Sequence, residues 1–240
     1  MNYKINVNGG GIFSKYMICL KNLVHVGFDN LYINVTDERT KPDILNSVLN
    51  QIVNDNFLNL NCNFNPTYDD NTKIELSNDF NRYKEIITKI KFNEKLLTKL
   101  KYYEEKLNIT EKTIGVHLRL TDMNIYHKSD YGYKDFNDYL KFINKDDDFF
   151  IASDNEESLE KLRNIFGNKI KYVPDLIRAK TENEDSLNLQ LDNFKNDIFW
   201  EQCFIEMLLL SKCGSIICRT SSLANASIIH SNTIQKIIRI

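Results

Sequence analysis

Short apolar runs alternate with amphipathic segments along most of this 240-residue chain. Residues 3–8 alternate between polar and apolar side chains as a half-buried strand does, and residues 31–35 form a second apolar strand-like run. Between them, residues 13–25 place apolar side chains three or four positions apart, which predicts a helix with one buried face. A further helix is predicted over residues 42–53, and a loop-rich segment over residues 54–71.

The second half of the chain has a more regular pattern. Charged amphipathic sequence over residues 79–107 predicts one or two helices, and strands and helices alternate after it. We expect strands at 113–120, 148–152, 169–173, 215–219 and 234–240, and helices at 136–142, 156–166, 199–211 and 223–230. Gly167 is placed to end the helix before it. This repetition predicts an α/β fold, with a parallel sheet covered by helices on both faces.

Length, charge and cysteine content narrow the class of protein. A net charge of -2 gives no strongly basic face of the kind that binds nucleic acid. No run approaches the ~18–20 consecutive apolar residues of a membrane span, and the N-terminus opens into a strand instead of a signal peptide. The 5 cysteines form no CxxC pair, which favours buried thiols in a reducing compartment over a disulfide frame or a zinc site. We therefore expect a soluble cytoplasmic protein without a nucleic-acid partner.

The strand predicted at 113–120 ends in polar residues. His117 and Arg119 share one face of it, and Asp122 follows where the chain turns. Ligands of open α/β sheets bind at the carboxyl ends of the strands, and the planar guanidinium of arginine matches phosphate oxygens. The alternatives are a salt bridge from Arg119 to Asp122 or Asp154, and a hydrogen-bonded core role for His117. The pattern favours a phosphorylated ligand here.

Later strand ends carry similar groups. Asp154 follows an apolar strand, where it can accept from a ribose hydroxyl or a base N–H, or else cap the next helix. Thr220, Ser221 and Ser222 follow the strand at 215–219, where a hydroxyl can cap a helix or, with the helix amides, hold a diphosphate.

Glycines also stand between the first strand and the first helix. Gly10 and Gly11, within the run 9–11, would let the backbone approach a ligand at the helix N-terminus. The run lacks the spacing of a dinucleotide fingerprint and the lysine of a P-loop, which argues against a nucleotide-dependent oxidoreductase. A tight turn alone would also explain these glycines.

Taken in order, the segments 117–122, 151–154 and 218–224 resemble the C-terminal motifs of the fucosyltransferase superfamily, including α1,2- and α1,6-fucosyltransferases and their bacterial relatives. The resemblance covers roughly residues 80–230. It implies a GT-B-like fold in which two Rossmann-like parallel-sheet domains face each other across a cleft. With a break near 108–112, residues 1–110 would form the acceptor-side domain and residues 111–240 the nucleotide-sugar domain. Leu120 departs from the pattern, because many members carry a second arginine at that point.

The resemblance implies an inverting glycosyltransferase that moves a sugar, fucose first, from a nucleoside-diphosphate sugar to a glycan hydroxyl without a metal or other cofactor. Arg119 would neutralise the leaving diphosphate, an electrostatic stabilisation that strengthens in a dry cleft. Ser221 and Ser222 would hold the same diphosphate, Asp154 would select the nucleoside, and His117 would orient ribose or phosphate.

A base must then deprotonate the acceptor hydroxyl. Asp69 and Asp70, in the acceptor-side half, are the first candidates, and His127 and Asp130 are the others. The missing second arginine leaves two alternatives open. One is a transferase for another nucleotide sugar such as UDP-xylose, and the other is a non-catalytic module of the same fold that binds nucleotide or glycan.

Overall fold

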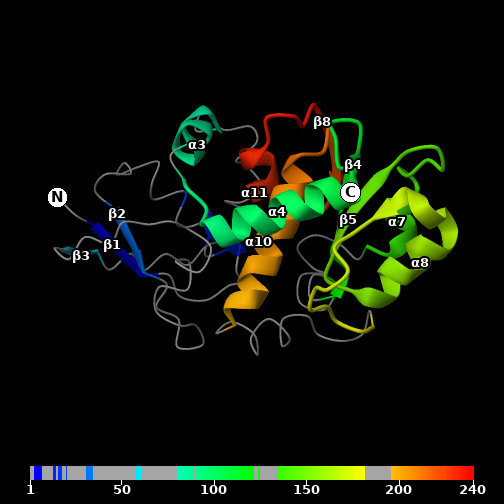
Figure 1. Cartoon of the computed structure of the whole chain (residues 1–240), viewed down its shortest axis with the longest axis horizontal. Helices are drawn as coiled ribbons and strands as arrows, with labels where there is room; N and C mark the ends of the chain where they lie inside the picture. Colours follow the sequence, from blue (N-terminus) through cyan, green and yellow to red (C-terminus); the bar gives the residue numbers. More distant parts are fainter. Residues whose placement is uncertain are drawn as a thin grey trace.

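The structure is a computed structural model, shown in Figure 1. It describes residues 3–6, 13–14, 16–17, 20, 31–34, 58–60, 80–88, 90–121, 124, 134–181 and 196–240. Two parallel sheets organise this part of the chain, a 3-stranded sheet of N-terminal strands and a 5-stranded sheet of C-terminal strands. The α/β class predicted from the sequence is confirmed.

The N-terminal sheet joins β1 (Tyr3–Asn6), β2 (Leu31–Asn34) and β3 (Leu58–Leu60) in the order β2-β1-β3, all parallel. The strands predicted near residues 3 and 31 are confirmed, and residues 13, 14, 16, 17 and 20 are helical as predicted. The prediction that residues 54–71 are a loop-rich segment is wrong where β3 lies. A strand of 3 residues is too short to show a period, and its pairing with β1 defines it. The predicted helix 42–53 lies outside the described residues.

The C-terminal sheet has the order β6-β5-β4-β7-β8, and every neighbouring pair is parallel. Its strands are β4 (Ile114–Leu118), β5 (Phe149–Ser153), β6 (Ile170–Lys171), β7 (Ser215–Cys218) and β8 (Lys236–Arg239). All 5 were predicted, although β6 is shorter than the range 169–173. β4 is the central strand, so both of its edges are paired and both of its faces are covered.

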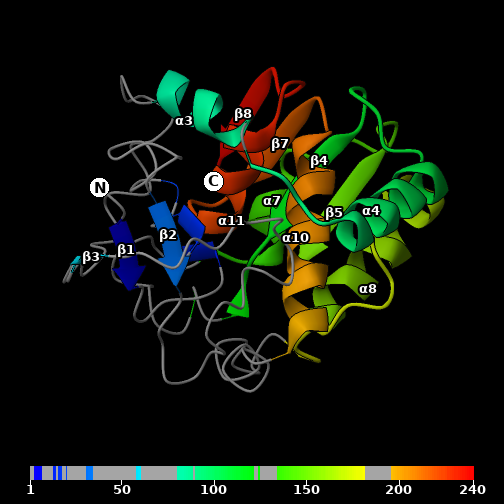
Figure 2. The ribbon, with the colours of Figure 1, turned by 60° about the vertical axis from the view of Figure 1, so that its left-hand side comes forward.

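Helices cover the two faces of this sheet, as Figures 1 and 2 show. The helices α7 (Phe136–Leu140) and α8 (Glu156–Phe166) share one apolar cluster with β4 and β5. The opposite face packs on α10 (Asp197–Ser211) and α11 (Ser222–His230), and α3 (Phe80–Ile87) and α4 (Glu94–Leu107) lie outside them. The helix after β5 ends at Gly167 as predicted, with a φ of 58° that suits glycine.

The alternation of side chains along β4 decides what each face receives. Val116 and Leu118 point into the α7–α8 cluster, whereas Gly115 and His117 point toward α10 and α11. A Cβ on Gly115 would lie 2.9 Å from Leu210 Cδ2, so glycine lets α10 approach the strand closely. The polar end of β4 therefore emerges on the α10–α11 side.

The N-terminal helical residues share the core of the α10–α11 side. Phe13 and Tyr16 pack against Phe204 of α10, and the Tyr16 hydroxyl lies 2.7 Å from His230 Nε2 at the end of α11. Residues of α3 and α4, which precede the predicted boundary near 110, join the same cluster. The division into domains 1–110 and 111–240, and a cleft between them, stay predictions. No helix within the described ranges is long and apolar enough to cross a membrane.

Candidate functional site

The strand order reverses at the centre of the C-terminal sheet. From β4 the chain passes through α7 to β5 and then to β6 on one side, whereas β7 lies on the other side of β4 and leads through α11 to β8. The connections after β4 and β7 therefore leave on opposite faces of the sheet. Ligands of open α/β sheets bind in the crevice outside such a switch point. The carboxyl ends of β4 and β7 are thus the first place to look for a site.

His117 and Ser221 meet at this switch point. The Ser221 hydroxyl lies 3.1 Å from His117 Nδ1, and it accepts the backbone N–H of Ala224 at 3.1 Å. Ser221 is therefore the N-cap of α11, as predicted, and its remaining hydrogen can be donated to the imidazole. His117 is only 4% exposed, so this contact fixes the start of α11 beside the end of β4. Thr220 precedes the cap and Ser222 opens the helix, and both are partly buried.

Arg119 follows the last residue of β4 and is partly buried. Its backbone N–H donates to the Tyr139 hydroxyl at 3.3 Å, which holds the start of the β4–α7 connection. Burial and the nearby Glu206 raise the pKa of the Cys203 thiol on α10, while the charges of Arg119 and Arg178 oppose that rise. Arg119 lies two positions after His117, so the alternation of the strand places the two side chains on the same face.

Asp154 follows β5, the strand next to β4. Its Oδ2 accepts from the Thr121 hydroxyl at 2.7 Å, so the ends of β4 and β5 are tied together. The alternative that Asp154 caps α8 is wrong, because Asn155 is the N-cap and accepts from the Ser158 N–H at 2.7 Å. The Asn155 side chain therefore caps α8. The Asp154 carboxylate lies at the carboxyl end of β5, beside the residues that follow β4.

Leu120 faces away from this site. It is 2% exposed and belongs to the apolar cluster of β4, α7 and α8. The residue that departs from the expected arginine pair is therefore a core side chain on the face opposite His117. Its neighbour Arg119 has the opposite parity along the strand and so points to the His117 face.

Arginines gather at the carboxyl ends of the strands, and of these the sequence reasoning assigned a role to Arg119 alone. Of the 31 basic residues only 7 are arginine, and 4 of these lie here: Arg119, Arg178, Arg219 and Arg239. Arg219, directly after β7, is 1% exposed and donates to Asn124 Oδ1 at 2.8 Å. The available signal was arginine at strand ends in a chain whose other cations are mostly lysine.

Arg239 supports the turn that leads into α11. Its Nη1 donates to the Arg219 carbonyl at 3.1 Å and to Cys218 Sγ at 3.0 Å, and its Nη2 donates to Asn225 Oδ1 at 2.8 Å. Burial lowers the pKa of Arg239 to about 10, so the guanidinium stays charged at neutral pH. Burial also raises the pKa of Cys218 to about 12, which keeps this thiol neutral beside the guanidinium.

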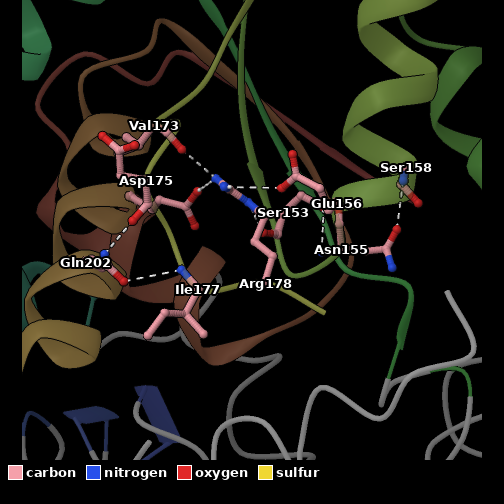
Figure 3. Close-up of polar contacts among 10 residues, drawn as sticks. Ser153, Asn155, Glu156, Ser158, Val173, Asp175, Ile177, Arg178 and Gln202 are labelled. Atoms are coloured by element: carbon pink, nitrogen blue, oxygen red, sulfur yellow. Dashed lines mark hydrogen bonds and ion pairs between the residues drawn. The ribbon is translucent and has the colours of Figure 1, made fainter. Parts of the chain in front are cut away.

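Arg178 and Glu206 form a buried ion pair on the α10 side of β5, drawn in Figure 3. The Arg178 Nη2 lies 3.0 Å from Glu206 Oε1, and the side chains are 2% and 9% exposed. Burial raises the pKa of Glu206 to about 7, although the charge of Arg178 and a hydrogen bond from it act in the opposite direction. This pair was also missed, since neither residue stands directly after a predicted strand.

Several predicted site residues lie outside the described residues. These are the glycines at 9–11, which include Gly10 and Gly11, the turn residue Asp122, and all four base candidates, Asp69, Asp70, His127 and Asp130. Within the described ranges, no group of three or more His, Cys, Asp or Glu side chains is arranged to hold a metal ion. Metal independence stays a prediction.

Comparison with known proteins adds information about the fold. No protein-family model matches the chain, and no curated protein sequence matches it. Among solved structures, NodZ α-1,6-fucosyltransferase soaked with GDP-fucose is similar with a TM-score of 0.57 and 13% identity, over 100% of this chain and 94% of NodZ. NodZ co-crystallised with GDP gives 0.58 and 12% over 100% and 95%, and fucosyltransferase NodZ from Bradyrhizobium gives 0.56 and 12% over 100% and 96%. The chain therefore has a fucosyltransferase-like glycosyltransferase fold.

Proposed function

We propose that the protein is an inverting glycosyltransferase that takes a sugar from a nucleoside-diphosphate donor and transfers it to a glycan hydroxyl. The observation that carries this proposal is the meeting of Arg119, the His117–Ser221 pair and the N-terminus of α11 at the switch point of the sheet. A guanidinium and a helix N-terminus at one crevice suit a diphosphate, which is anionic and rich in acceptor oxygens.

The roles of the individual groups follow from their contacts. The Ser221 hydroxyl already caps α11 and contacts His117, so we assign phosphate binding to the helix N-terminus that this cap opens. Arg119 would bind the same diphosphate from the end of β4. The His117 imidazole acts through Ser221, because it holds the cap and thus the helix amides in place.

The reaction needs one bond to break and one to form. The bond between the anomeric carbon and the diphosphate oxygen breaks, and its electron pair leaves with the diphosphate. The acceptor oxygen bonds to the opposite face of the same carbon, and its proton passes to a base. Arg119 would stabilise the charge that develops on the leaving group. Asp69 and Asp70 are proposed first as the base, with His127 and Asp130 as the other candidates.

Asp154 is proposed to recognise the nucleoside. One carboxylate oxygen is held by Thr121, which fixes the orientation of the group at the end of β5. A carboxylate accepts hydrogen bonds only, so it can select ribose hydroxyls or base N–H groups. NodZ structures obtained with GDP-fucose and with GDP support GDP-fucose as the first donor to test.

The test combines donor binding with turnover. Wild-type protein is titrated with GDP, UDP, CDP and ADP by calorimetry, and then incubated with the sugar donors of any nucleotide that binds, with and without glycan acceptors. We expect one nucleotide to bind and Arg119→Ala to lower turnover by about 100- to 1000-fold. Arg82→Ala, an exposed arginine on α3, is the matched control and should behave as the wild type.

Each other outcome changes the conclusion. Turnover with UDP-sugars alone would move the donor to the UDP class, with UDP-xylose among the first candidates. Binding of nucleotide or glycan without sugar transfer or donor hydrolysis would identify a non-catalytic module. Binding and turnover that survive Arg119→Ala would refute the proposed site.

A further inference from the structure

The dipeptide Arg178–Ala179 lies across the carboxyl end of β5. The Ala179 N–H donates to the Asp154 carbonyl at 2.9 Å, and the Glu156 N–H donates to the Ala179 carbonyl at 2.8 Å. These two bonds enclose Asp154 and Asn155 in a short parallel bridge. The main chain directly after the Asp154 side chain is therefore fixed by a segment from beyond β6.

The Arg178 side chain adds a third restraint to the same turn. Its Nε donates to the Ser153 carbonyl at 3.0 Å, directly before Asp154, and its Nη2 donates to the Val173 carbonyl at 2.9 Å. The same Nη2 reaches Glu206 on α10 at 3.0 Å, and Nη1 lies 3.7 Å from Glu156 on α8 (Figure 3). One guanidinium thus joins the end of β5, the start of α8 and the middle of α10.

A second residue of α10 holds the other end of this segment. The Gln202 amide donates from Nε2 to the Asp175 carbonyl at 2.6 Å, and its Oε1 accepts from the Ile177 N–H at 3.3 Å. Gln202 and Glu206 are four residues apart, so they lie on one face of α10. This face of α10 contacts residues 173–179, which we call the arm, through Gln202 at one end and through Glu206 at the other.

The chemistry of the Arg178–Glu206 ion pair indicates that it orients the backbone more than it stabilises the fold. A buried ion pair loses about as much free energy by desolvation as its attraction returns, and apolar groups of equal volume often serve stability better. In contrast, the Arg178 guanidinium donates to two main-chain carbonyls and so fixes the positions of both backbone segments. Lysine lacks this planar arrangement of donors and cannot replace it. What it fixes here is the turn that presents Asp154.

We propose that Arg178 is a positioning residue for donor binding, which acts through Asp154 by holding the Ser153–Glu156 turn against the arm. This inference rests on the proposed function, since it takes Asp154 to contact the nucleoside. Glu206 provides the counter-charge that keeps the guanidinium in place, and Gln202 keeps the arm on α10. Arg178 itself does not need to touch the ligand.

The experiment is a double-mutant cycle on nucleotide affinity. Dissociation constants for the nucleoside diphosphate that the wild type binds are measured for Arg178→Lys, Asp154→Asn and the double variant. We expect each single change to weaken binding by about tenfold and the double variant to match Asp154→Asn alone, because Arg178 would act only through that carboxylate. Lysine keeps a cation beside Glu206 and loses the donor to Ser153, so the fold is retained while the turn loosens.

The matched control is Lys171→Met on β6, whose bonds lie at the amino ends of the strands, away from Asp154. Lys171 is a cation that is 14% exposed and, like Arg178, bonds both a carboxylate and a main-chain carbonyl: Asp148 Oδ2 at 3.0 Å and the Asn108 carbonyl at 2.9 Å. Its replacement should leave nucleotide affinity unchanged. Hydrogen exchange gives a readout that needs no ligand: the Glu156 and Ala179 amides should exchange faster in Arg178→Lys than in the control.

The outcomes separate the two proposals. If the wild type binds no nucleoside diphosphate, the proposed function fails, and this inference fails with it. If Asp154→Asn weakens binding while Arg178→Lys does not, or if the two effects add, the positioning role alone is wrong. Unchanged exchange of the Glu156 and Ala179 amides in Arg178→Lys would also overturn it.

Discussion

Replacing Leu120 by arginine tests which way the end of β4 faces. The change would create the adjacent arginine pair that many members of the superfamily resembled by these motifs carry. From the sequence alone, it would be expected to strengthen donor binding. In the structure, however, Leu120 is 2% exposed and packs in the cluster that contains Leu118 and Tyr139. The structure therefore predicts that Leu120→Arg damages the core and adds nothing to the site beside Arg119.

The magnitude follows from this burial. Loss of a fully buried leucine removes about 1.5–3 kcal/mol of hydrophobic stabilisation. An arginine left in the apolar cluster without a counter-charge adds about 3–5 kcal/mol of further cost, reduced where the long side chain reaches the sheet edge. The sum approaches the whole stability of an ordinary domain, about 5–15 kcal/mol. We expect Leu120→Arg to unfold at much lower urea concentration than the wild type, or to be unfolded without urea.

Urea unfolding followed by circular dichroism is the assay. Leu97→Arg on α4, where leucine is 45% exposed, makes the same chemical change on the surface and should shift stability by no more than about 0.5 kcal/mol. Leu120→Met keeps the volume and should cost less than about 1.5 kcal/mol. A Leu120→Arg protein with wild-type stability and tighter nucleotide binding would refute the reasoning and place residue 120 in the donor site.

Three more changes test the packing of the C-terminal sheet and its helices. Ser221→Ala removes the N-cap of α11 and should cost about 1 kcal/mol in urea unfolding. Burial, with Lys84 nearby, lowers the pKa of His230 to about 3, so the unfolded state binds more protons below its ordinary pKa and stability falls on acidification. Between about pH 7 and pH 5 this linkage amounts to about 2 kcal/mol, which His230→Gln should remove from the measured pH dependence of unfolding. Gly214→Ala would bring a Cβ within 1.7 Å of the Glu111 carbonyl oxygen and should lower stability by about 3 kcal/mol, the upper end of the usual cost of overpacking, in the same urea assay.

Matched controls make these outcomes decisive. Ser222→Ala lies one residue inside α11 and should cost less than the cap variant, so equal losses would contradict the cap assignment. Gly115→Ala meets side chains, Leu210 Cδ2 at 2.9 Å and Cys213 Sγ and Cβ at 3.2 and 3.3 Å, and should be milder than Gly214→Ala, which meets backbone. An unchanged pH slope in His230→Gln would show that the imidazole is not held neutral in the folded protein.

Local sequence predicted most elements because their signals are local. Helix α8 begins and ends as predicted, since its apolar period, the polar residues before it and Gly167 all lie within a few residues. Strands β4, β5 and β7 are apolar runs because both sheet faces are covered. In contrast, the short β3 exists only through its pairing with β1, which no local pattern can encode.

The candidate site was predictable in part for a similar reason. His117 and Arg119 lie at the end of one predicted strand, and Asp154 and Ser221 follow two others. A parallel sheet places the carboxyl ends of its strands along one edge. That inference required no tertiary detail. The assignment of Asp154 as a possible cap failed because the neighbouring Asn155 presents an equally suitable oxygen, and only the backbone path decides between them.

By itself, the sequence determined the β-α order, the parallel sheet and the polar residues that end its strands, because hydrophobic periodicity and capping act over a few residues. Only the tertiary structure decided the direction of each side chain and its distant partners. It placed Leu120 in the core, brought Glu206 to Arg178, and set Arg219 beside Asn124. These contacts join residues 28 to 95 positions apart, so they depend on how the helices pack on the sheet and have no local signature.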